Sequence, residues 1–164
     1  MADGRTVPAG PLPQGVEIRR VGPGEVEVVL AASPLFDGAA RRSAAERFLA
    51  SPTHHLLLAT EGGRAVAFVS GVETTHPDKG TEMFLYELAV DEHARRRGIG
   101  RALVDALREL AIERGCYGMW VSTEPDNEAA IRTYRAAGAG EPEPFVLLEW
   151  GFEEAAEADQ EADP

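Results

Sequence analysis

Apolar and polar residues follow two different periods along this chain, and the shorter one marks its strands. Alternation and short apolar runs predict strands at 16–21, 55–59, 65–72 and 82–91. Glu61-Gly62-Gly63, between the second and third of these, suits the positive φ angles of a tight hairpin turn. We also expect a short strand at 117–121 and a last strand at 145–150 that closes the sheet.

The longer period predicts helices at about 24–32, 42–50 and 126–137, and a well-defined one that begins near residue 99. The apolar residues of this last helix recur at steps of three and four, which places them on one face: Ile99, Ala102, Leu103, Ala106, Leu107, Leu110 and Ala111. Gly115 is expected to end it. The order of elements predicts an α/β fold with a mixed, mostly antiparallel central sheet and helices on both faces.

A basic, glycine-containing stretch joins the strand at 82–91 to the helix that follows it. It reads Arg95-Arg96-Arg97-Gly98-Ile99-Gly100-Arg101-Ala102. The first turn of a helix has unpaired N–H groups and a partial positive charge, so it attracts anions, and glycine lets a phosphate approach the backbone. The stretch lacks the Lys-Ser/Thr ending of a Walker loop and the spacing of the Rossmann motif. It therefore predicts a phosphorylated ligand of another kind.

Length and composition limit the architecture and the compartment. At 164 residues the chain is expected to form one domain at 15–152, between a flexible tail at 1–14 and an acidic, disordered tail at 153–164. No apolar run approaches the length that spans a bilayer, and the first residues lack the apolar core of a signal peptide. The single cysteine, Cys116, cannot form an internal disulfide, so we expect a cytoplasmic protein.

The net charge of −12 argues against a nucleic-acid partner, because such binding depends on neutralising phosphates. The charge is compatible with a polycationic substrate, and it is equally compatible with simple solubility. None of the histidines has a metal-ligand spacing, so no metal site is expected.

The basic stretch resembles the Q/R-x-x-G-x-G/A signature of the GCN5-related N-acetyltransferases (GNAT), with Arg95, Gly98 and Gly100 in register. Leu88-Ala89-Val90-Asp91 before it, and Asn127 and Tyr134 after it, extend the resemblance over roughly residues 16–150. The resemblance implies that the ligand is acetyl-coenzyme A. The residues expected to bind it are Leu88, Ala89, Val90, Arg95, Arg96, Arg97, Gly98, Ile99, Gly100, Arg101, Ala102, Asn127 and Tyr134.

Acetyl transfer to an amine needs a base for the ammonium proton, hydrogen-bond donors for the oxyanion and an acid for the departing thiolate. Glu87 is the candidate base, because alternation places it with Met83, Leu85 and Ala89 on an otherwise apolar face; a bulge in this strand would reverse that face. The resemblance assigns the acid to Tyr134. The N–H of Leu88 or Ala89 is a candidate oxyanion donor. Asn127 could contact the ligand or only cap its helix.

The segments 82–90, 95–99 and 130–134 also resemble the type I aminoglycoside 3-N-acetyltransferases. This resemblance implies transfer to the 3-amino group of gentamicin-like antibiotics and a homodimer, with Glu82, Glu87 and Glu149 holding ammonium groups of the substrate. The connection at 138–144, rich in glycine and proline, departs from that pattern. The alternatives are another acceptor, such as a polyamine, an amino acid or a peptide amine, and a non-catalytic module that only binds acyl-CoA.

Overall fold

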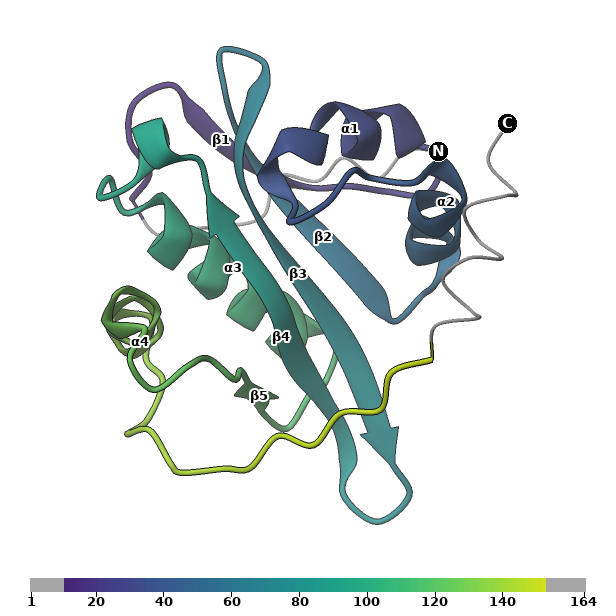
Figure 1. Ribbon diagram of the computed structural model, residues 1–164, viewed down its shortest axis with the longest axis vertical. Helices are drawn as coiled ribbons and strands as arrows, with labels where there is room; N and C mark the ends of the chain where they lie inside the picture. Colours follow the sequence, from purple (N-terminus) through teal and green to yellow (C-terminus); the bar gives the residue numbers. More distant parts are fainter. Residues whose placement is uncertain (1–10, 153–164) are drawn as a thin grey trace.

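The computed structural model describes residues 11–152, which form one sheet between two layers of helices (Figure 1). The sheet has the order β1-β2-β3-β4-β5. Its strands are β1 (Val16–Arg20), β2 (His54–Glu61), β3 (Arg64–His76), β4 (Gly80–Val90) and β5 (Met119–Trp120). The first four strands are antiparallel neighbours, whereas β5 is parallel to β4 because a helix connects them. The predicted mixed, mostly antiparallel sheet is confirmed.

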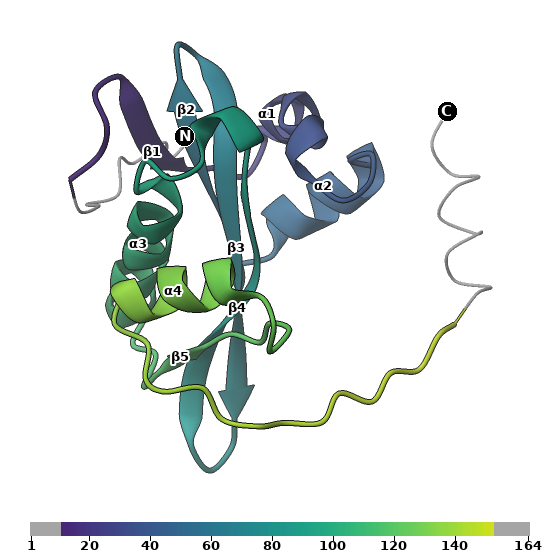
Figure 2. The same cartoon turned by 60° about the vertical axis from the view of Figure 1, so that its left-hand side comes forward.

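The helices cover both faces of the sheet, as Figure 2 shows. They are α1 (Val26–Ala31), α2 (Arg42–Ala50), α3 (Ile99–Glu113) and α4 (Glu128–Ala136), with short 3₁₀ turns at Ser33–Leu35 and Glu92–Ala94. The predicted helices are confirmed, with boundaries that differ by a few residues. No helix within residues 11–152 is both long and apolar enough to cross a membrane.

Each face of the sheet has its own apolar core. On one face, α3 buries all seven residues that the period of three and four had placed together, against Ile18, Leu57 and Val69. The helix approaches β3 so closely that a Cβ on Gly71 would lie 2.8 Å from Leu107 Cδ1. On the other face, α1 and α2 pack over Leu56, Leu58 and Phe68. Leu12, which falls in the expected N-terminal tail, packs against the α3 core.

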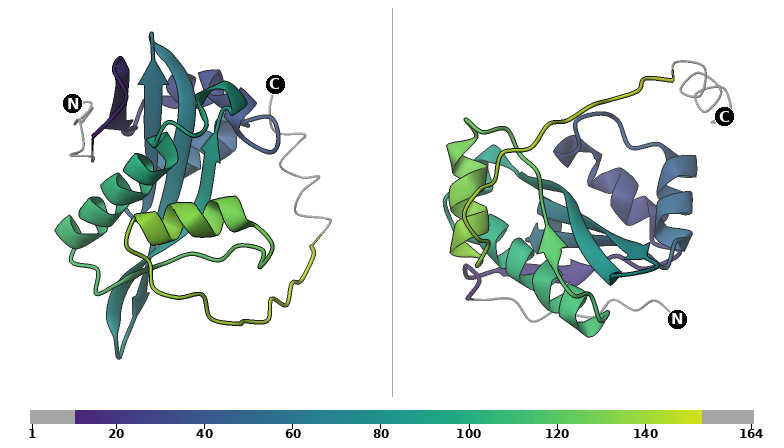
Figure 3. Two further views of the ribbon diagram at one scale, coloured as in Figure 1. Left: turned by 90° about the vertical axis from the view of Figure 1, so that its left-hand side faces the viewer. Right: turned by 90° about the horizontal axis from the view of Figure 1, so that it is seen from below.

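The strand expected at 145–150 is absent from the structure, and this prediction was wrong. Residues 139–152 belong to no helix or strand and run away from α4 as an extended segment (Figure 3). Within the described part of the chain, β5 is therefore the last strand of the sheet. The remainder of the two expected tails, 1–10 and 153–164, lies outside the described residues.

A β-bulge interrupts β4 at Tyr86. The register between β3 and β4 shifts there, because Ser70 faces Glu87 whereas Gly71 faces Leu85. One extra residue reverses the side on which all later side chains lie. Met83 and Leu85 therefore lie in the α3 core, whereas Ala89, two residues beyond Glu87, packs on the α1–α2 side. The shared face predicted for Glu87 was wrong in part, since Glu87 shares a side with Ala89 alone.

Candidate active site

A large concavity opens where β4 separates from β5. It has a volume of about 1120 Å³ and is lined by the end of β4, the basic turn, the start of α3, one side of α4 and the segment 34–37. Strands β4 and β5 pair only at Met83–Met119 and Phe84–Trp120. The edge of β4 from Tyr86 onward is therefore not covered by β5. An uncovered strand edge can accept an extended ligand as an added strand.

The basic turn forms one wall of this cavity. Gly98 precedes α3 with φ +83°, a left-handed conformation that favours glycine. The first hydrogen bond of the helix runs from Ala102 N–H to Gly98 O at 3.0 Å, so the N–H groups of Ile99, Gly100 and Arg101 have no carbonyl partner in α3. No side chain caps this end of α3. The helix therefore presents free donors and its positive end to the cavity.

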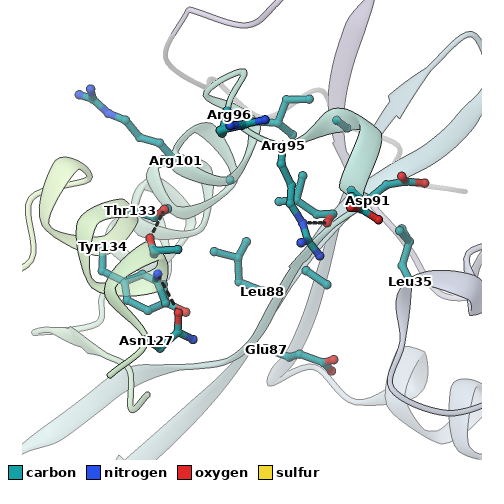
Figure 4. Close-up of a pocket in the computed structure, with 18 of the residues that line it drawn as sticks. Leu35, Glu87, Leu88, Asp91, Arg95, Arg96, Arg101, Asn127, Thr133 and Tyr134 are labelled. Atoms are coloured by element: carbon teal, nitrogen blue, oxygen red, sulfur yellow. Dashed lines mark hydrogen bonds between the residues drawn. The ribbon is translucent and has the colours of Figure 1, made fainter. Parts of the chain in front are cut away.

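The four arginines of the turn have different partners. Arg95 Nε donates to Val90 O at 3.0 Å, which ties the turn to the end of β4 and occupies that carbonyl (Figure 4). Arg96 lines the cavity with φ +59°, and Arg101 lines it beside Asp105, 3.6 Å from it. Arg97 does not line the cavity, because both its terminal nitrogens bind the Glu61 carboxylate at 2.7 and 3.1 Å. Three arginines remain available to an anion.

Gly100 lines the cavity between side chains of β4 and α4. A Cβ at this position would be 3.4 Å from Val90 Cγ2, 3.6 Å from Thr133 Cγ2 and 3.9 Å from Leu88 Cδ2. These are ordinary van der Waals distances, so the fold itself tolerates a methyl group here. A larger side chain would fill the space over the free N–H groups.

Glu87 lies on the opposite side of β4, next to the segment that follows α1 (Figure 4). Burial raises the pKa of its carboxyl above the usual 4.5, and the negative charge of Asp37 raises it further. A carboxylate with a raised pKa is a stronger base than an exposed one. Asp37 is a member of the site that the sequence pattern did not reveal, because nothing local connects residue 37 to residue 87.

Tyr134 and Asn127 come from α4, and Figure 4 shows them on the side of Leu88 that lies away from Glu87. Tyr134 packs against the α3 core, and burial raises the pKa of its hydroxyl above 10.0, so the group keeps its proton at neutral pH. Asn127 accepts a hydrogen bond from Ala130 N–H at 3.1 Å. The capping role considered for Asn127 is therefore present, and the same residue also lines the cavity.

The structure gathers most of the expected site residues and leaves some outside. Those that line the cavity are Glu87, Leu88, Ala89, Val90, Arg95, Arg96, Gly98, Ile99, Gly100, Arg101, Asn127 and Tyr134. Ala102 is buried in the α3 core. Glu82 lies further back along β4, where its carboxylate accepts a 2.7 Å hydrogen bond from the Tyr117 hydroxyl and lies 3.5 Å from His76 Nε2.

Glu149 also lies outside the cavity, because the strand that was expected to position it does not form. Thr123, Arg132 and Thr133 are further lining residues that the sequence did not single out. Within residues 11–152, no group of three or more histidine, cysteine or acidic residues could hold a metal ion.

Curated proteins similar to this chain are N-acetyltransferases of amino groups. The [ribosomal protein bS18]-alanine N-acetyltransferase of Escherichia coli is 33% identical over 82 residues, which are 50% of this chain and 52% of that protein. The L-2,4-diaminobutyric acid acetyltransferase of Nocardia farcinica is 32% identical over 80 residues, or 49% of this chain and 40% of that protein. The chain thus spans about half the length of the curated relatives it matches.

Solved structures share the fold over most of the chain. One aminoglycoside acetyltransferase from an uncultured soil metagenomic sample superposes with a TM-score of 0.78 at 18% identity, covering 84% of this chain and 97% of that one. A second, also from a soil metagenomic sample, is 27% identical with a TM-score of 0.71, covering 83% and 99%. The model of the acetyltransferase (GNAT) family matches residues 27–139. With the turn, the open strand edge and the fold in agreement, the chain belongs to the acetyltransferase (GNAT) family.

Proposed function

We propose that this protein transfers the acetyl group of acetyl-CoA to a primary amine of an aminoglycoside, at the 3-amino group of gentamicin-like compounds. The observation that carries the proposal is a single cavity that joins an anion-binding helix end, an uncovered strand edge and a carboxylate with a raised pKa. Members of the family use acetyl-CoA as their acyl donor.

The residues present fit acetyl-CoA as a substrate. The N–H groups of Ile99, Gly100 and Arg101, with the charges of Arg95, Arg96 and Arg101, suit its pyrophosphate. The edge of β4 at Leu88 and Ala89 suits its pantetheine arm, whose amides can pair with a strand. Because Arg95 already occupies the Val90 carbonyl, Leu88 and Ala89 contribute the remaining backbone groups.

The reaction requires a general base, a hydrogen-bond donor to the oxyanion and a general acid, and the chain has a candidate group for each. Glu87 accepts the ammonium proton of the acceptor, directly or through water, which frees the nitrogen lone pair to attack the thioester carbonyl. The N–H of Leu88 or Ala89 donates to the carbonyl oxygen as negative charge develops on it. Tyr134 gives its proton to the departing thiolate sulfur. The nitrogen loses its second proton as the amide forms, and this proton restores the Tyr134 hydroxyl. The products are the amide, free coenzyme A as its thiol, and the proton held by Glu87.

The aminoglycoside assignment is supported by the acidic acceptor side and by the structural relatives. Asp37 and Glu87 both line the cavity and are near enough for the charge of Asp37 to raise the pKa of Glu87, and carboxylates attract a polycationic sugar. Both solved structures described above are aminoglycoside acetyltransferases, one of them at 27% identity. Retention of Glu87 and Tyr134 in one cavity argues against a module that binds acyl-CoA without catalysis.

A second candidate acceptor is the amino group of an amino acid or of a peptide terminus. The curated relatives favour it, since one acetylates a ribosomal-protein alanine and another L-2,4-diaminobutyric acid. Both candidate reactions use the same acetyl-CoA site and the same base, Glu87. They differ only in the acceptor molecule that binds next to Asp37.

A thiol-release assay across a panel of acceptors tests the proposal. The panel contains gentamicin, kanamycin, spermidine, L-2,4-diaminobutyric acid and a peptide that begins with alanine. We expect the highest kcat/KM with gentamicin and, by NMR of the product, acetylation of the 3-amino group. Turnover of the peptide or the amino acid with none of the aminoglycosides would reject the first candidate in favour of the second. Binding of acetyl-CoA with no turnover of any acceptor would reject both.

A further inference from the structure

Three aromatic side chains form a continuous surface on one face of the sheet. Phe84 of β4 stacks on Trp120 of β5, with ring centroids 4.2 Å apart and an interplanar angle of 29°. Tyr86 meets Phe84 edge to face, with centroids 5.9 Å apart and an angle of 85°. The exposed fraction is 66% for Tyr86 and 47% for Trp120. These three residues, which we call the aromatic shelf, therefore present rings to solvent from two neighbouring strands.

The shelf lies on the side of the sheet opposite α3, beyond the area that α1 and α2 cover. Phe84 alternates with Met83 and Leu85, whose side chains belong to the α3 core. Figure 1 shows α1 and α2 over the other end of the sheet. Within residues 11–152, the apolar core of these two helices includes Phe68 but no residue of the shelf. An uncovered aromatic patch of this kind marks a binding surface.

The bulge at Tyr86 joins the shelf to the candidate base. The extra residue places Tyr86 and Glu87 next to each other on the same side of β4. Both residues line the cavity that contains the basic turn, and both also line a smaller pocket of about 240 Å³ against α2. A molecule whose amine reaches Glu87 therefore has the shelf as an adjoining surface for its other groups.

A carboxylate marks the far end of the shelf. Glu82 lies on the same side of β4 as Phe84 by alternation, about 15 Å from Glu87 at the rise of a strand. Its carboxylate accepts a 2.7 Å hydrogen bond from the Tyr117 hydroxyl. This bond, with the nearby His76 and Trp120, lowers the pKa of Glu82, so the carboxylate stays charged at neutral pH. Both ends of the shelf are therefore acidic, which suits a ligand with several ammonium groups.

The size and chemistry of the shelf fit a small molecule better than a protein. An aromatic side chain contributes about 150–250 Å² when it is fully buried, and the side chains of the shelf are already partly covered. A stable protein interface needs about 800 Å² from each partner. Aromatic rings stack on the apolar C–H face of a sugar ring, and their electron-rich faces attract an ammonium group. The shelf therefore has the surface chemistry of a site for an amino sugar.

We propose that the aromatic shelf binds a sugar ring of the aminoglycoside that is not acetylated, while the deoxystreptamine ring presents its 3-amino group to Glu87. The bound ring stacks on Tyr86 and Trp120, and its ammonium groups lie toward Glu82. This subsite rests on the proposed function, since it needs an acceptor of more than one ring. It also separates the two candidate acceptors, because a free amino acid at Glu87 is too short to extend over the shelf.

Steady-state kinetics with a long and a short acceptor test the subsite. Gentamicin carries sugar rings on its deoxystreptamine, whereas 2-deoxystreptamine is that single ring with the same amino group. Trp120→Leu keeps an apolar side chain and removes the aromatic face. We expect this variant to raise the KM for gentamicin by about tenfold with kcat nearly unchanged, and to leave kcat/KM for 2-deoxystreptamine unchanged. Trp120→Phe should restore most of the affinity for gentamicin.

Ile112→Ala is the matched control, because Ile112 is an exposed apolar residue on α3, and the variant should alter the kinetics of neither acceptor. An unchanged gentamicin KM in Trp120→Leu, or an equal loss with both acceptors, would overturn the subsite and leave the proposed function intact. Wild-type turnover of neither acceptor would instead reject the proposed function, and the subsite with it.

Tryptophan fluorescence tests occupancy of the shelf without turnover. Trp120 and Trp150 are the two tryptophans of the chain, so the emission of Trp150→Phe reports on Trp120 alone. With coenzyme A in place of acetyl-CoA, gentamicin should change this emission saturably, and 2-deoxystreptamine should not. No change with gentamicin would overturn the subsite. An emission that depends on protein concentration without any acceptor would show that a second copy covers the shelf, which would also overturn it.

Discussion

The carboxyl group of Glu87 is the residue-scale feature on which the proposed chemistry most depends. Replacing Glu87 by Gln keeps its size and hydrogen-bonding capacity but removes its ability to accept a proton. We expect kcat to fall by about 10²- to 10⁴-fold, the range of general acid–base groups, while the Kd for acetyl-CoA stays the same. Steady-state kinetics and calorimetry measure the two quantities. Normal turnover in this variant at neutral pH would remove Glu87 from the role.

The charge of Asp37 offers a second test at the same scale. Because burial and Asp37 both raise the pKa of Glu87, the acidic limb of kcat/KM should lie above pH 4.5, where Glu87 loses its proton. Asp37→Asn removes the negative charge that helps to raise the pKa of Glu87, so the acidic limb of the kcat/KM profile should move to lower pH. The profile should be recorded with saturating acetyl-CoA. Asp126→Asn is a control, because that residue lies outside the cavity and the limb should not move.

Single residues also show how far the sequence can predict a site. The basic turn lines the cavity except at Arg97 and Ala102, and the sequence could single it out because its motif is continuous; its role in binding acetyl-CoA stays a prediction. Glu87 was placed on the wrong face relative to Leu85, since a bulge at Tyr86 has no clear sequence signal. Asp37 was missed because it meets Glu87 only after the chain folds. Glu82 is bound by Tyr117 instead of facing the cavity, which spacing alone cannot reveal.

At the scale of elements, the start of α3 and the edge of β4 form the proposed donor site, and Gly100 lies between them. Gly100→Val would add branched carbon atoms where a Cβ already comes within 3.4 Å of Val90, above the free N–H groups. We expect a loss of acetyl-CoA affinity of at least tenfold with little change in melting temperature. Calorimetry measures the first and circular dichroism the second.

Gly118→Val is the matched control for this variant, because nothing lies within 4 Å of a Cβ at Gly118 and the residue is outside the cavity. Its affinity for acetyl-CoA should match that of the wild type. Equal affinity in Gly100→Val as well would contradict a phosphate cradle at this turn.

The elements themselves were predictable where local pattern and long-range partner agree. The apolar face of α3 was predicted from spacing, and the structure buries every residue of it. The segment 145–150 was predicted to be a strand on the same grounds, yet it has no strand partner within residues 11–152. Periodicity and composition indicate what a segment tends to bury, but they do not say against which surface.

At the scale of the whole molecule, a buried polar cluster joins three strands to the end of α3. Arg20 of β1 donates to Nδ1 of His55 in β2 at 2.8 Å, so the proton of the neutral imidazole lies on Nε2, which is 2.7 Å from Glu73 of β3. Arg114, just after α3, completes the cluster with a 2.6 Å hydrogen bond to the same carboxylate. Every polar group is paired, which is what burial requires.

Stability should depend on pH through this cluster. Burial lowers the pKa of His55 below its usual 6.5, although the hydrogen bond to Glu73 opposes the shift. Below pH 6.5 the unfolded chain therefore binds a proton that folded His55 resists. We expect the free energy of unfolding to be constant above this pH with respect to His55, and to fall as the pH decreases through the lowered pKa. Urea denaturation at pH 7.5, 6.5 and 5.5 measures the effect.

His93→Gln is the control for this experiment, because His93 is exposed and its removal should leave the pH dependence unchanged. His55→Gln should lower stability at pH 7.5 and reduce the additional loss at pH 5.5. A wild-type profile that is flat between 7.5 and 5.5 would contradict the assignment of a neutral His55.

The bulge at Tyr86 has a consequence for how such an enzyme can diversify. Leu88 and Val90 face the α3 core, whereas Glu87 and Ala89 face α1 and α2, so the same short strand serves two sides of one cavity. Mutations in the segment between α1 and α2 can remodel what is recognised on one side without altering how the thioester is held on the other. New acceptors can therefore be acquired while the donor machinery is inherited intact.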